Sequence, residues 1–294
     1  MEIILIANFG SRSTEKELGR VQAALIDAGV HITASHAVGR GRELTKRLRA
    51  IVKDEPPIVA VAGGDGSMTR AAAELAHRRS ILAVLPLGTG NSFARSLGIP
   101  DVQTAIATIA SGKCCKIDLG VVNGRYFANF ATVGLTSEIA ARTPDALKRI
   151  AGVGAYVLAG LIPALRDHRF HAKLKGKGVR FQGDVHQVIV ASGRYFGSTP
   201  LLPTASVTSG KLAVFTTTAD GVPGVAREFL AVARGRQTEL EQAHWWTTSR
   251  VKVMSREREL IAIDGKPIDE TPARFHIEPG ALRVLVPLDF DGLP

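Results

Sequence analysis

The sequence predicts an α/β N-terminal domain with a parallel sheet, followed by a mostly antiparallel C-terminal domain that is either β-sandwich-like or an open barrel. Up to about residue 120, short apolar runs alternate with amphipathic stretches, which is the pattern of a parallel sheet covered by helices. Beyond that point strand-like runs follow one another with few helical interruptions, as in antiparallel β structure. The change of pattern near residue 120 predicts one domain at 1–120, with 287–294 as a segment that completes it, and a second at 121–286. No low-complexity linker separates the halves, so we expect them to pack closely.

In the first half, each expected strand is a short apolar run and each expected helix has one apolar face. The stretch 43–53, for example, carries Leu44, Leu48 and Ile51 at i, i+4 and i+7, which places them on one side of a helix. We expect strands at 3–7, 30–34, 58–62, 81–85 and 116–119 and helices at 15–28, 43–53 and 68–77. Ligands of such sheets bind beyond the carboxyl ends of the strands.

The second half begins with the signature of a β-hairpin. Asn123-Gly124 lies between two apolar runs and favours the type I′ turn that matches strand twist. Further strands are expected at 186–191, 211–217, 251–254, 259–263, 273–277 and 282–286, with helices at 145–165 and 222–234.

The charge of the chain favours an anionic partner. Its net charge is +10, from 37 basic and 27 acidic residues, which suits a nucleotide, a nucleic acid or an acidic membrane surface. Aromatic residues make up 5% of the chain and are not interleaved with the basic ones, so a single-stranded nucleic acid is disfavoured.

The cysteines and the apolar segments indicate a cytoplasmic protein. The two cysteines, Cys114 and Cys115, are adjacent, which excludes a disulfide framework and does not fit a zinc site. We expect them to be buried at a strand edge in a reducing compartment. The first apolar run predicts a strand in place of a signal peptide, and the apolar stretch 150–165 is too short and too interrupted to span a membrane. Peripheral contact with an anionic membrane stays open, because 148–169 is apolar between basic ends; a helix that covers the sheet explains this segment equally well.

The most informative motif is a glycine-rich turn at the end of the third expected strand. Gly63-Gly64-Asp65-Gly66-Ser67 follows the apolar run 58–62 and precedes a helix-like segment. Glycines allow the backbone to approach a ligand, and the unpaired N–H groups of the helix that follows attract phosphate. Asp65 adds a carboxylate that could bind Mg²⁺ or accept a proton. The alternative is a tight turn without a ligand.

Two further turns fall at the same edge of the predicted sheet. One contains Asn8 and Ser11, and the other is the Pro86–Asn91 segment, in which Thr89 offers a hydroxyl and Asn91 suits the N-cap of a short helix. Three such turns at one edge favour a phosphate site over a turn without a ligand.

Together with later motifs, these turns resemble the diacylglycerol kinase catalytic family, which includes bacterial diacylglycerol and related lipid kinases and is akin to sphingosine kinases. The resemblance extends over nearly the whole chain. It rests on the segments 63–67, 86–95, 116–120, 125–129, 147–152, 263–265 and 281–287. The Gly-Gly-Asp-Gly turn also occurs in NAD kinases and phosphofructokinases, but Gly88–Arg95 and the β-rich second half favour the lipid kinases.

The resemblance implies a kinase that uses ATP and Mg²⁺ to phosphorylate a lipid hydroxyl. By this resemblance Asp65 and Asp118 would belong to a carboxylate–Mg²⁺ network, and the Asp264-Gly265 turn would supply catalytic groups from the second domain. The residues that would contact ATP are Asn8, Ser11, Gly63, Gly64, Asp65, Gly66, Ser67, Met68, Thr69, Arg70, Gly88, Thr89 and Asn91.

Three positions depart from the family pattern, and each lacks an expected carboxylate. Lys266 replaces the glutamate that follows Asp-Gly, Ser92 replaces an aspartate after the Gly88–Asn91 turn, and Thr208-Ser209-Gly210 replaces Asp-Asp-Gly. A lysine is protonated at neutral pH and cannot be the same base. Two hypotheses follow: Asp264 or Asp65 takes the role of the base, or the chain binds nucleotide or lipid with little or no kinase activity.

Overall fold

A computed structural model describes residues 1–8, 15–142, 169–196, 199–200, 205–218 and 240–292, together with residues 224, 227, 231 and 236. The chain forms two compact units. Unit 1 consists of 1–119, 207–209 and 278–293, and unit 2 consists of 120–206, 210–277 and residue 294. Two strands, β5 (Lys113–Val122) and β18 (Ala273–Val286), continue from one unit into the other.

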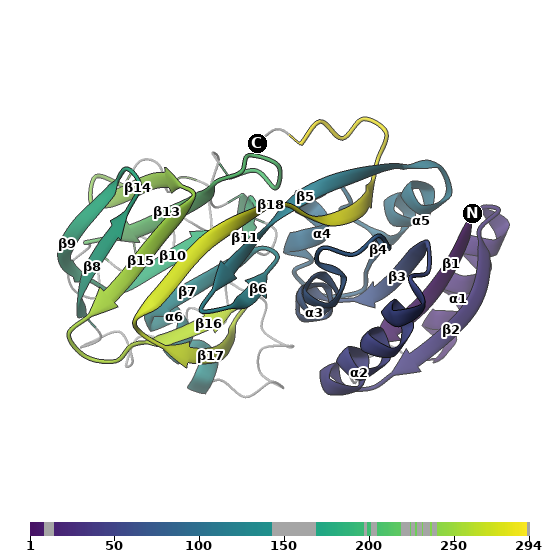
Figure 1. The fold of residues 1–294 in the computed structure, drawn as a ribbon, viewed down its shortest axis with the longest axis horizontal. Coiled ribbons are helices and arrows are strands. Elements are labelled where there is room, and N and C mark those ends of the chain that lie inside the picture. The colour runs from purple at the N-terminus through teal and green to yellow at the C-terminus, as the bar shows by residue number, and fades with distance from the viewer. Residues whose placement is uncertain are drawn as a thin grey trace. The chain divides into compact units, whose positions relative to one another are not determined.

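Unit 1 is built on a parallel sheet in the order β2-β1-β3-β4, and β18 pairs with β4 in the same direction (Figure 1). All six residues of β3 are buried, as expected of a parallel strand covered on both faces. The four strands are β1 (Glu2–Asn8), β2 (His31–Val38), β3 (Ile58–Gly63) and β4 (Ile81–Pro86).

Helices cover this sheet in two contacting pairs, α1 with α5 and α2 with α3. In α2 the residues Leu44, Leu48 and Ile51 are buried on one face, as their spacing predicts. The helical elements are α1 (Glu15–Asp27), α2 (Gly41–Ile51), the 3₁₀ turn η1 (Val52–Asp54), α3 (Asp65–Leu75), α4 (Ser92–Ser96) and α5 (Val102–Ser111).

The strand order of unit 1 contains a topological switch point. From β1 the chain passes to β2 on one side and then returns to β3 on the other side of β1. Connections that leave in opposite directions open a crevice outside the carboxyl ends of the two central strands. Asn8 and Gly63 are the last residues of these strands, so the crevice lies at two of the predicted turns.

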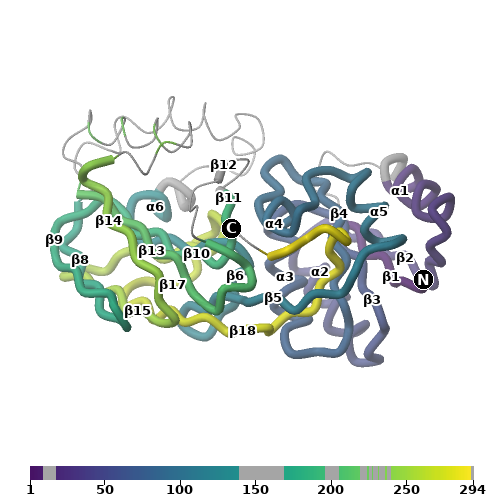
Figure 2. Tube along the Cα trace, turned by 90° about the horizontal axis from the view of Figure 1, so that it is seen from above, coloured from purple at the N-terminus to yellow at the C-terminus, as the bar shows by residue number. Residues whose placement is uncertain are grey.

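Unit 2 contains a six-stranded antiparallel sheet in the order β14-β13-β10-β7-β16-β17. A second layer is formed by β9-β8-β15 and the first part of β18 (Figure 2). The elements are β6 (Arg125–Phe127), β7 (Phe130–Gly134), α6 (Leu135–Arg142), β8 (Phe170–Gly176), β9 (Val179–Val185), β10 (Gln187–Ala191), β11 (Tyr195–Phe196), β12 (Thr199–Pro200), β13 (Leu212–Thr217), β14 (Ala243–Thr248), β15 (Arg250–Ser255), β16 (Leu260–Ile263) and β17 (Lys266–Glu270).

The core of unit 2 lies between these two layers. Val133 and Val190 of the six-stranded sheet belong to the same buried cluster as Leu174, Val253 and Phe275 of the other layer. α6 contacts β7, β16 and β17. The parallel sheet of unit 1 and the antiparallel, sandwich-like unit 2 confirm the predicted fold class.

Some elements differ from the sequence-based expectation. The strands expected at 273–277 and 282–286 are one strand, β18, in which Gly280 has a φ of 61°. The β8–β9 hairpin was not predicted, although residues 170–175 alternate between apolar and polar types as a half-buried strand does. The expected helix 145–165 lies outside the described residues, as does most of 222–234.

The expectation of buried cysteines was wrong. Cys114 is exposed and Cys115 is half-buried, and both are free thiols. They lie near the start of β5, where four residues are largely exposed, whereas the strand is buried from Ile117 to Val122. Burial of the Cys115 thiol raises its pKa, which disfavours the reactive thiolate.

The cross-strand pair Gly120–Phe127 generates a stability prediction for unit 2. The fully buried Phe127 ring covers its partner Gly120 and meets Phe275 edge-on at 6.3 Å. A β-carbon at position 120 would lie 2.1 Å from this ring. We expect Gly120→Ala to lower the free energy of unfolding by about 1–3 kcal/mol in a urea titration.

A second glycine provides the control. Gly19 lies on the exposed side of α1, with no atom within 4 Å of an added β-carbon. Gly19→Ala should leave stability unchanged or raise it by about 0.5–1 kcal/mol. Equal stability of the two variants would contradict the packing argument.

Candidate functional site in unit 1

The first two predicted turns meet at the switch point of unit 1. The Asn8 side-chain amide at the end of β1 donates a 2.8 Å hydrogen bond to Ser67 Oγ in the first turn of α3. Asn8 Oδ1 is buried and has no hydrogen-bond partner among the residues that the structure describes. Buried polar atoms are nearly always hydrogen-bonded, so an unpartnered oxygen beside a glycine-rich turn indicates a place where a ligand or a water binds.

The second and third turns touch each other through their backbones. Because β3 and β4 pair in parallel, Gly63 lies beside Pro86, and Leu87 N–H donates to Gly63 O at 3.0 Å. A β-carbon at Gly88 would lie 2.5 Å from Cα of Gly64, and one at Gly64 would lie 3.2 Å from Cα of Gly88. The contact therefore requires glycine at position 88 and leaves little room for a side chain at position 64.

Asp65 links the same two turns by a hydrogen bond. Its Oδ1 accepts a 3.0 Å bond from the backbone N–H of Phe93 and thereby caps the short helix α4. Asp65 is the first residue of α3, where a carboxylate is favoured by the helix dipole. Among the described residues, no hydrogen bond to Asp65 Oδ2 occurs, so this oxygen is available to a ligand.

The structure corrects the role of Asn91. This residue is at the predicted N-cap position of α4, but its side chain makes no capping bond. Asn91 Oδ1 accepts from Gly88 N–H and its amide donates to Gly88 O, each at 2.9 Å. Asn91, with a φ of 51°, therefore shapes the turn around Gly88, while Asp65 supplies the cap.

Thr89, Arg70 and Met68, which were also predicted to contact the ligand, lie in three different environments. The Thr89 side chain is exposed, and no bond to its hydroxyl occurs among the described residues. Arg70 reaches α2, where Nη1 lies 3.4 Å from Thr45 Oγ1 and a β-carbon at Gly41 would lie 2.7 Å from Nε. The Met68 side chain is buried in the core, so the contribution we expected from it has no support.

The N-terminus of α3 has the geometry of a phosphate site. Gly64 occupies its N-cap with extended backbone and provides no side chain. The N–H groups of Ser67 and Met68 bond to Gly64 O, whereas the first N–H groups of a helix have no partner within it. With the Gly64–Gly88 contact and Asn8 Oδ1, the arrangement fits an anionic ligand that approaches the backbone closely.

Asp118 is buried and bonded within unit 1. It is 4% exposed, and its Oδ1 accepts a 2.9 Å bond from Gly280 N–H in β18. Its own N–H donates to Val207 O at 2.7 Å, and Thr208 Oγ1 donates to Gly292 O. Asp118 thus holds together the segments of unit 1 that come from distant parts of the chain.

Unit 2 contains the other predicted catalytic residue, Asp264. Asp264 and Gly265 have φ values of 45° and 73°, which makes them the two-residue turn between β16 and β17 that Asp-Gly favours. Asp264 N–H donates to Phe130 O at 3.2 Å, and Asp264 Oδ1 accepts from Phe130 N–H at 3.4 Å. The exposed Lys266 begins β17 directly after this turn.

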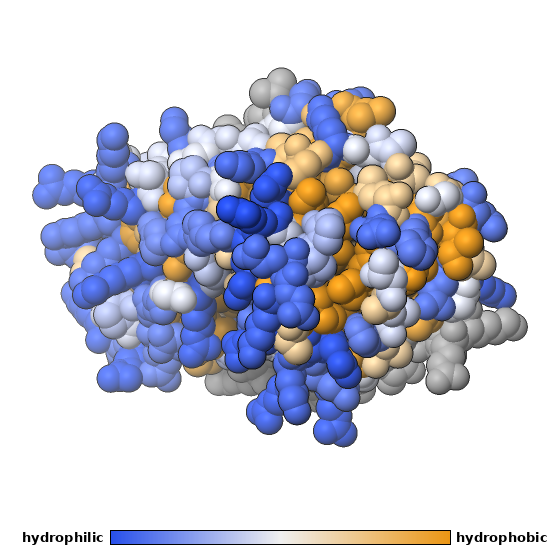
Figure 3. All heavy atoms as spheres, turned by 45° about the vertical axis from the view of Figure 1, so that its right-hand side comes forward, coloured by the Kyte–Doolittle hydropathy of each residue, from blue (hydrophilic) through white to orange (hydrophobic). Residues whose placement is uncertain are grey.

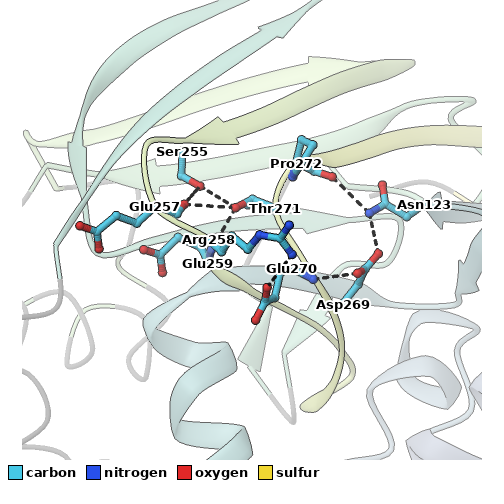
Figure 4. A network of polar contacts seen from close by, with 9 residues as sticks. All are labelled: Asn123, Ser255, Glu257, Arg258, Glu259, Asp269, Glu270, Thr271 and Pro272. Atoms are coloured by element: carbon cyan, nitrogen blue, oxygen red, sulfur yellow. Dashed lines mark hydrogen bonds and ion pairs between the residues drawn. The ribbon is translucent and has the colours of Figure 1, made fainter.

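A polar network holds the other end of β17 in place (Figure 4). The Asn123 amide donates to Asp269 Oδ2 at 2.9 Å and to Pro272 O at 3.2 Å, and Thr271 Oγ1 accepts from Glu259 N–H. The hydrogen bond from Asn123, the N–H of Glu270 and nearby arginines hold the pKa of Asp269 below its usual value. The hairpin that carries Asp264 is therefore fixed at both ends.

Asn129 and Arg194 of unit 2 were not among the site residues predicted from the sequence. Asn129 is 1% exposed and its amide donates to Tyr195 O at 2.6 Å, while Asn129 O accepts from the N–H groups of Ser192 and Gly193. Asn129 Oδ1 and Arg194 Nε are buried and have no hydrogen-bond partner within the described part of the chain. A signal was present, because an asparagine interrupts apolar strand residues directly before Phe130.

Some of the predicted features lie outside the part of the chain that the structure describes. Ser11 lies outside the described residues, as does nearly all of 148–169. Within the described ranges, no group of three or more histidine, cysteine, aspartate or glutamate residues is placed to hold a metal ion. In the same ranges, no helix is both long and apolar enough to cross a membrane.

Comparison with known families covers almost the whole chain. Residues 2–122 match the diacylglycerol kinase catalytic domain, and residues 131–286 match the YegS C-terminal NAD kinase beta sandwich-like domain. A "Probable lipid kinase YegS-like" of Pseudomonas aeruginosa is 31% identical over 97% of this chain and 94% of its own length. The "Diacylglycerol kinase" of Bacillus subtilis is 30% identical over 93% of this chain and 91% of its own length.

Solved structures share the fold. The crystal structure of a diacylglycerol kinase from Bacillus anthracis aligns with a TM-score of 0.71 at 19% identity, covering 97% of this chain and 96% of its own. A second solved structure from the same bacterium aligns with a TM-score of 0.80 at 22% identity, covering 97% and 95%.

The contact between Gly64 and Gly88 can be tested by nucleotide binding. We expect Gly88→Ala to push the two turns apart and to weaken ATP binding about tenfold or more, a loss of at least about 1.4 kcal/mol. The measurement is the rise in melting temperature with ATP concentration, with Gly19→Ala as the control. A folded Gly88→Ala protein that binds ATP as wild type does would contradict this role for the turns.

Proposed function

The chain belongs to the diacylglycerol kinase catalytic-domain family of lipid kinases, and we propose that it transfers the γ-phosphate of ATP to the hydroxyl of a lipid, diacylglycerol or a related molecule. The observation that carries this proposal is the junction of glycine turns in unit 1. There two backbones meet at a helix N-terminus beside an unpartnered buried oxygen. Such a junction suits the phosphates of a nucleotide.

Each side chain of the junction receives a role in this proposal. The backbone N–H groups of α3 bind phosphate oxygens, the Thr89 hydroxyl donates to another, and Asn91 and Ser67 hold the turns in shape. Asp65 would hold Mg²⁺ through its unbonded oxygen, together with phosphate oxygens and water. When bound, this ion neutralises negative charge on the phosphates. Asp118 is a positioning residue, because its carboxylate is buried and bonded to Gly280.

Asp264 is the proposed proton acceptor for the lipid hydroxyl. The turn that carries it is fixed by Phe130 and by the network around Asn123. Phosphoryl transfer through a loose transition state depends mostly on positioning and charge neutralisation, so a modest base suffices. Lys266 cannot act as this base while protonated.

Three residues favour a second function, in which the chain binds nucleotide or lipid without efficient phosphate transfer. Lys266, Ser92 and Ser209 stand where the family pattern has carboxylates, and the described residues contain no three-ligand metal group. A family member with these changes would bind nucleotide or lipid and transfer phosphate slowly or not at all.

Asp65 variants test the proposed function directly. Pure protein is incubated with labelled Mg-ATP and a panel of diacylglycerol, phosphatidylglycerol, ceramide and sphingoid bases. We expect transfer to at least one lipid by wild type and at least about a hundredfold less by Asp65→Asn, which retains an oxygen for Phe93 N–H but no charge. Asp65→Ala loses the hydrogen bond as well and should unfold more easily, by about 1 kcal/mol.

The pair of variants separates chemistry from stability. Full transfer by Asp65→Asn would show that Asp65 is only structural. Binding of ATP without transfer to any lipid would favour the non-catalytic alternative.

Lys266 provides a test of the missing carboxylate. If a carboxylate at this position limits the rate, Lys266→Glu should raise turnover about tenfold or more, because a positioned base contributes at least that much. Lys266→Gln removes the same positive charge without adding a base and should not raise it. An equal increase in both variants would mean that only the positive charge matters, and an unchanged rate in both would place the base elsewhere.

A further inference from the structure

The outward face of the second layer of unit 2 is lined by cations. Along these strands buried and exposed residues alternate, so that Leu174, Val253 and Phe275 face the core while their neighbours point outward. The outward cations form what we call the basic face: Lys173, Lys175, Arg180, Arg250, Lys252 and Arg274. In Figure 3 hydrophilic side chains crowd the left-hand part of the surface, where Figure 1 places β8 and β15.

Four of these cations form a continuous row across four strands. Arg180 of β9 lies opposite Lys175 of β8, and Lys175 lies opposite Lys252 of β15. Lys252 in turn lies opposite Arg274 of β18. At a strand spacing of about 4.8 Å the row is about 14 Å long. Like charges placed directly opposite one another destabilise a sheet, so this arrangement has a cost.

Among the described residues of unit 2, no acidic side chain is paired with the row. No hydrogen bond or ion pair of these four side chains occurs among the described residues. Asp184, on the same face of β9, is bonded to His171 at 2.8 Å. This bond, with nearby Arg169 and Arg256, holds the pKa of Asp184 below its usual value. The Asp184 carboxylate is therefore paired with His171 and does not pair with the cations of the row.

We propose that the basic face is the surface by which the chain docks on the anionic headgroups of a lipid bilayer. Charge complementarity defines the partner as anionic, and the face is a sheet surface that presents its cations side by side. Its remaining outward positions include Gln182, Met254, His171, Asp184 and His276, with no phenylalanine, tyrosine or tryptophan among the described residues of this face, unlike the stacking platforms that bind single-stranded nucleic acid. The choice of a bilayer rests on the proposed function, in which the acceptor is a lipid.

Vesicle binding by the full chain tests the proposal without nucleotide. Sucrose-loaded vesicles of phosphatidylcholine alone, or with an equal amount of phosphatidylglycerol, are sedimented with wild type and with Lys175→Gln/Lys252→Gln. We expect wild type to bind the anionic vesicles only and the double variant to bind at least about tenfold more weakly, since each basic residue near such a surface contributes about a factor of five. Added salt should weaken the binding of wild type.

A matched variant controls for net charge. Lys46→Gln/Lys53→Gln removes the same charge from exposed lysines of α2 and η1 and should bind as wild type does, and the melting temperatures of all three proteins should agree. Equal losses in both double variants, or no loss in Lys175→Gln/Lys252→Gln, would overturn the proposal. So would displacement of wild type from the vesicles by a DNA oligomer at lower concentration than phosphatidylglycerol.

Failure of docking and failure of the kinase proposal give different results. Lipid dispersed in neutral detergent micelles needs no anionic surface, so the basic-face variant should phosphorylate it at the wild-type rate. Transfer in micelles without vesicle binding by wild type would refute docking alone. Vesicle binding without transfer to any lipid would refute the kinase proposal and leave the surface in place.

Discussion

The backbone contact between Gly64 and Gly88 is the constraint on which the candidate site depends. It follows from the parallel pairing of β3 with β4, which places Gly63 beside Pro86 and leaves no room for a β-carbon at position 88. Asp65 then bridges the turns by accepting from Phe93 N–H, and the Asn8 amide ties the end of β1 to Ser67 in the first turn of α3. A change in the register of β3 and β4 would therefore separate Gly64 from Gly88 and Asp65 from Phe93, whereas the Asn8–Ser67 bond depends on the pairing of β1 with β3.

The two units carry different charged and polar groups, which suit different steps of the proposed reaction. Unit 1 offers backbone N–H groups and one carboxylate with an unbonded oxygen, a combination that suits phosphate and a bound cation. Unit 2 carries Asp264 on a hairpin fixed at both ends and, on its outer layer, the basic face. A lipid kinase needs a phosphate donor, a proton acceptor and access to a bilayer, and the chain provides a candidate for each.

Sequence patterns predicted the parts of this structure that depend on local chemistry. The Asn123-Gly124 turn, the buried stripe of α2 and the glycine turns at strand ends all follow from residue type and spacing, whereas the Asp264-Gly265 turn was expected from the family resemblance. The capping bond from Asp65 to Phe93 could not be predicted, because it joins residues that only strand pairing brings together. The β8–β9 hairpin was missed although apolar and polar residues alternate along β8, and three of its outward residues, Lys173, Lys175 and Arg180, belong to the basic face.

We propose that the junction of turns in unit 1 binds the phosphates of ATP. Amide chemical-shift mapping by NMR tests this most directly, because it reports on each backbone N–H separately. On titration with ATP we expect the largest shifts at Asn8, Gly64–Ser67 and Gly88–Gly90, with small shifts on α1 and on the outer strands of unit 2. Saturable binding of ATP with the largest shifts elsewhere, or no shifts at all in the folded protein, would contradict the account.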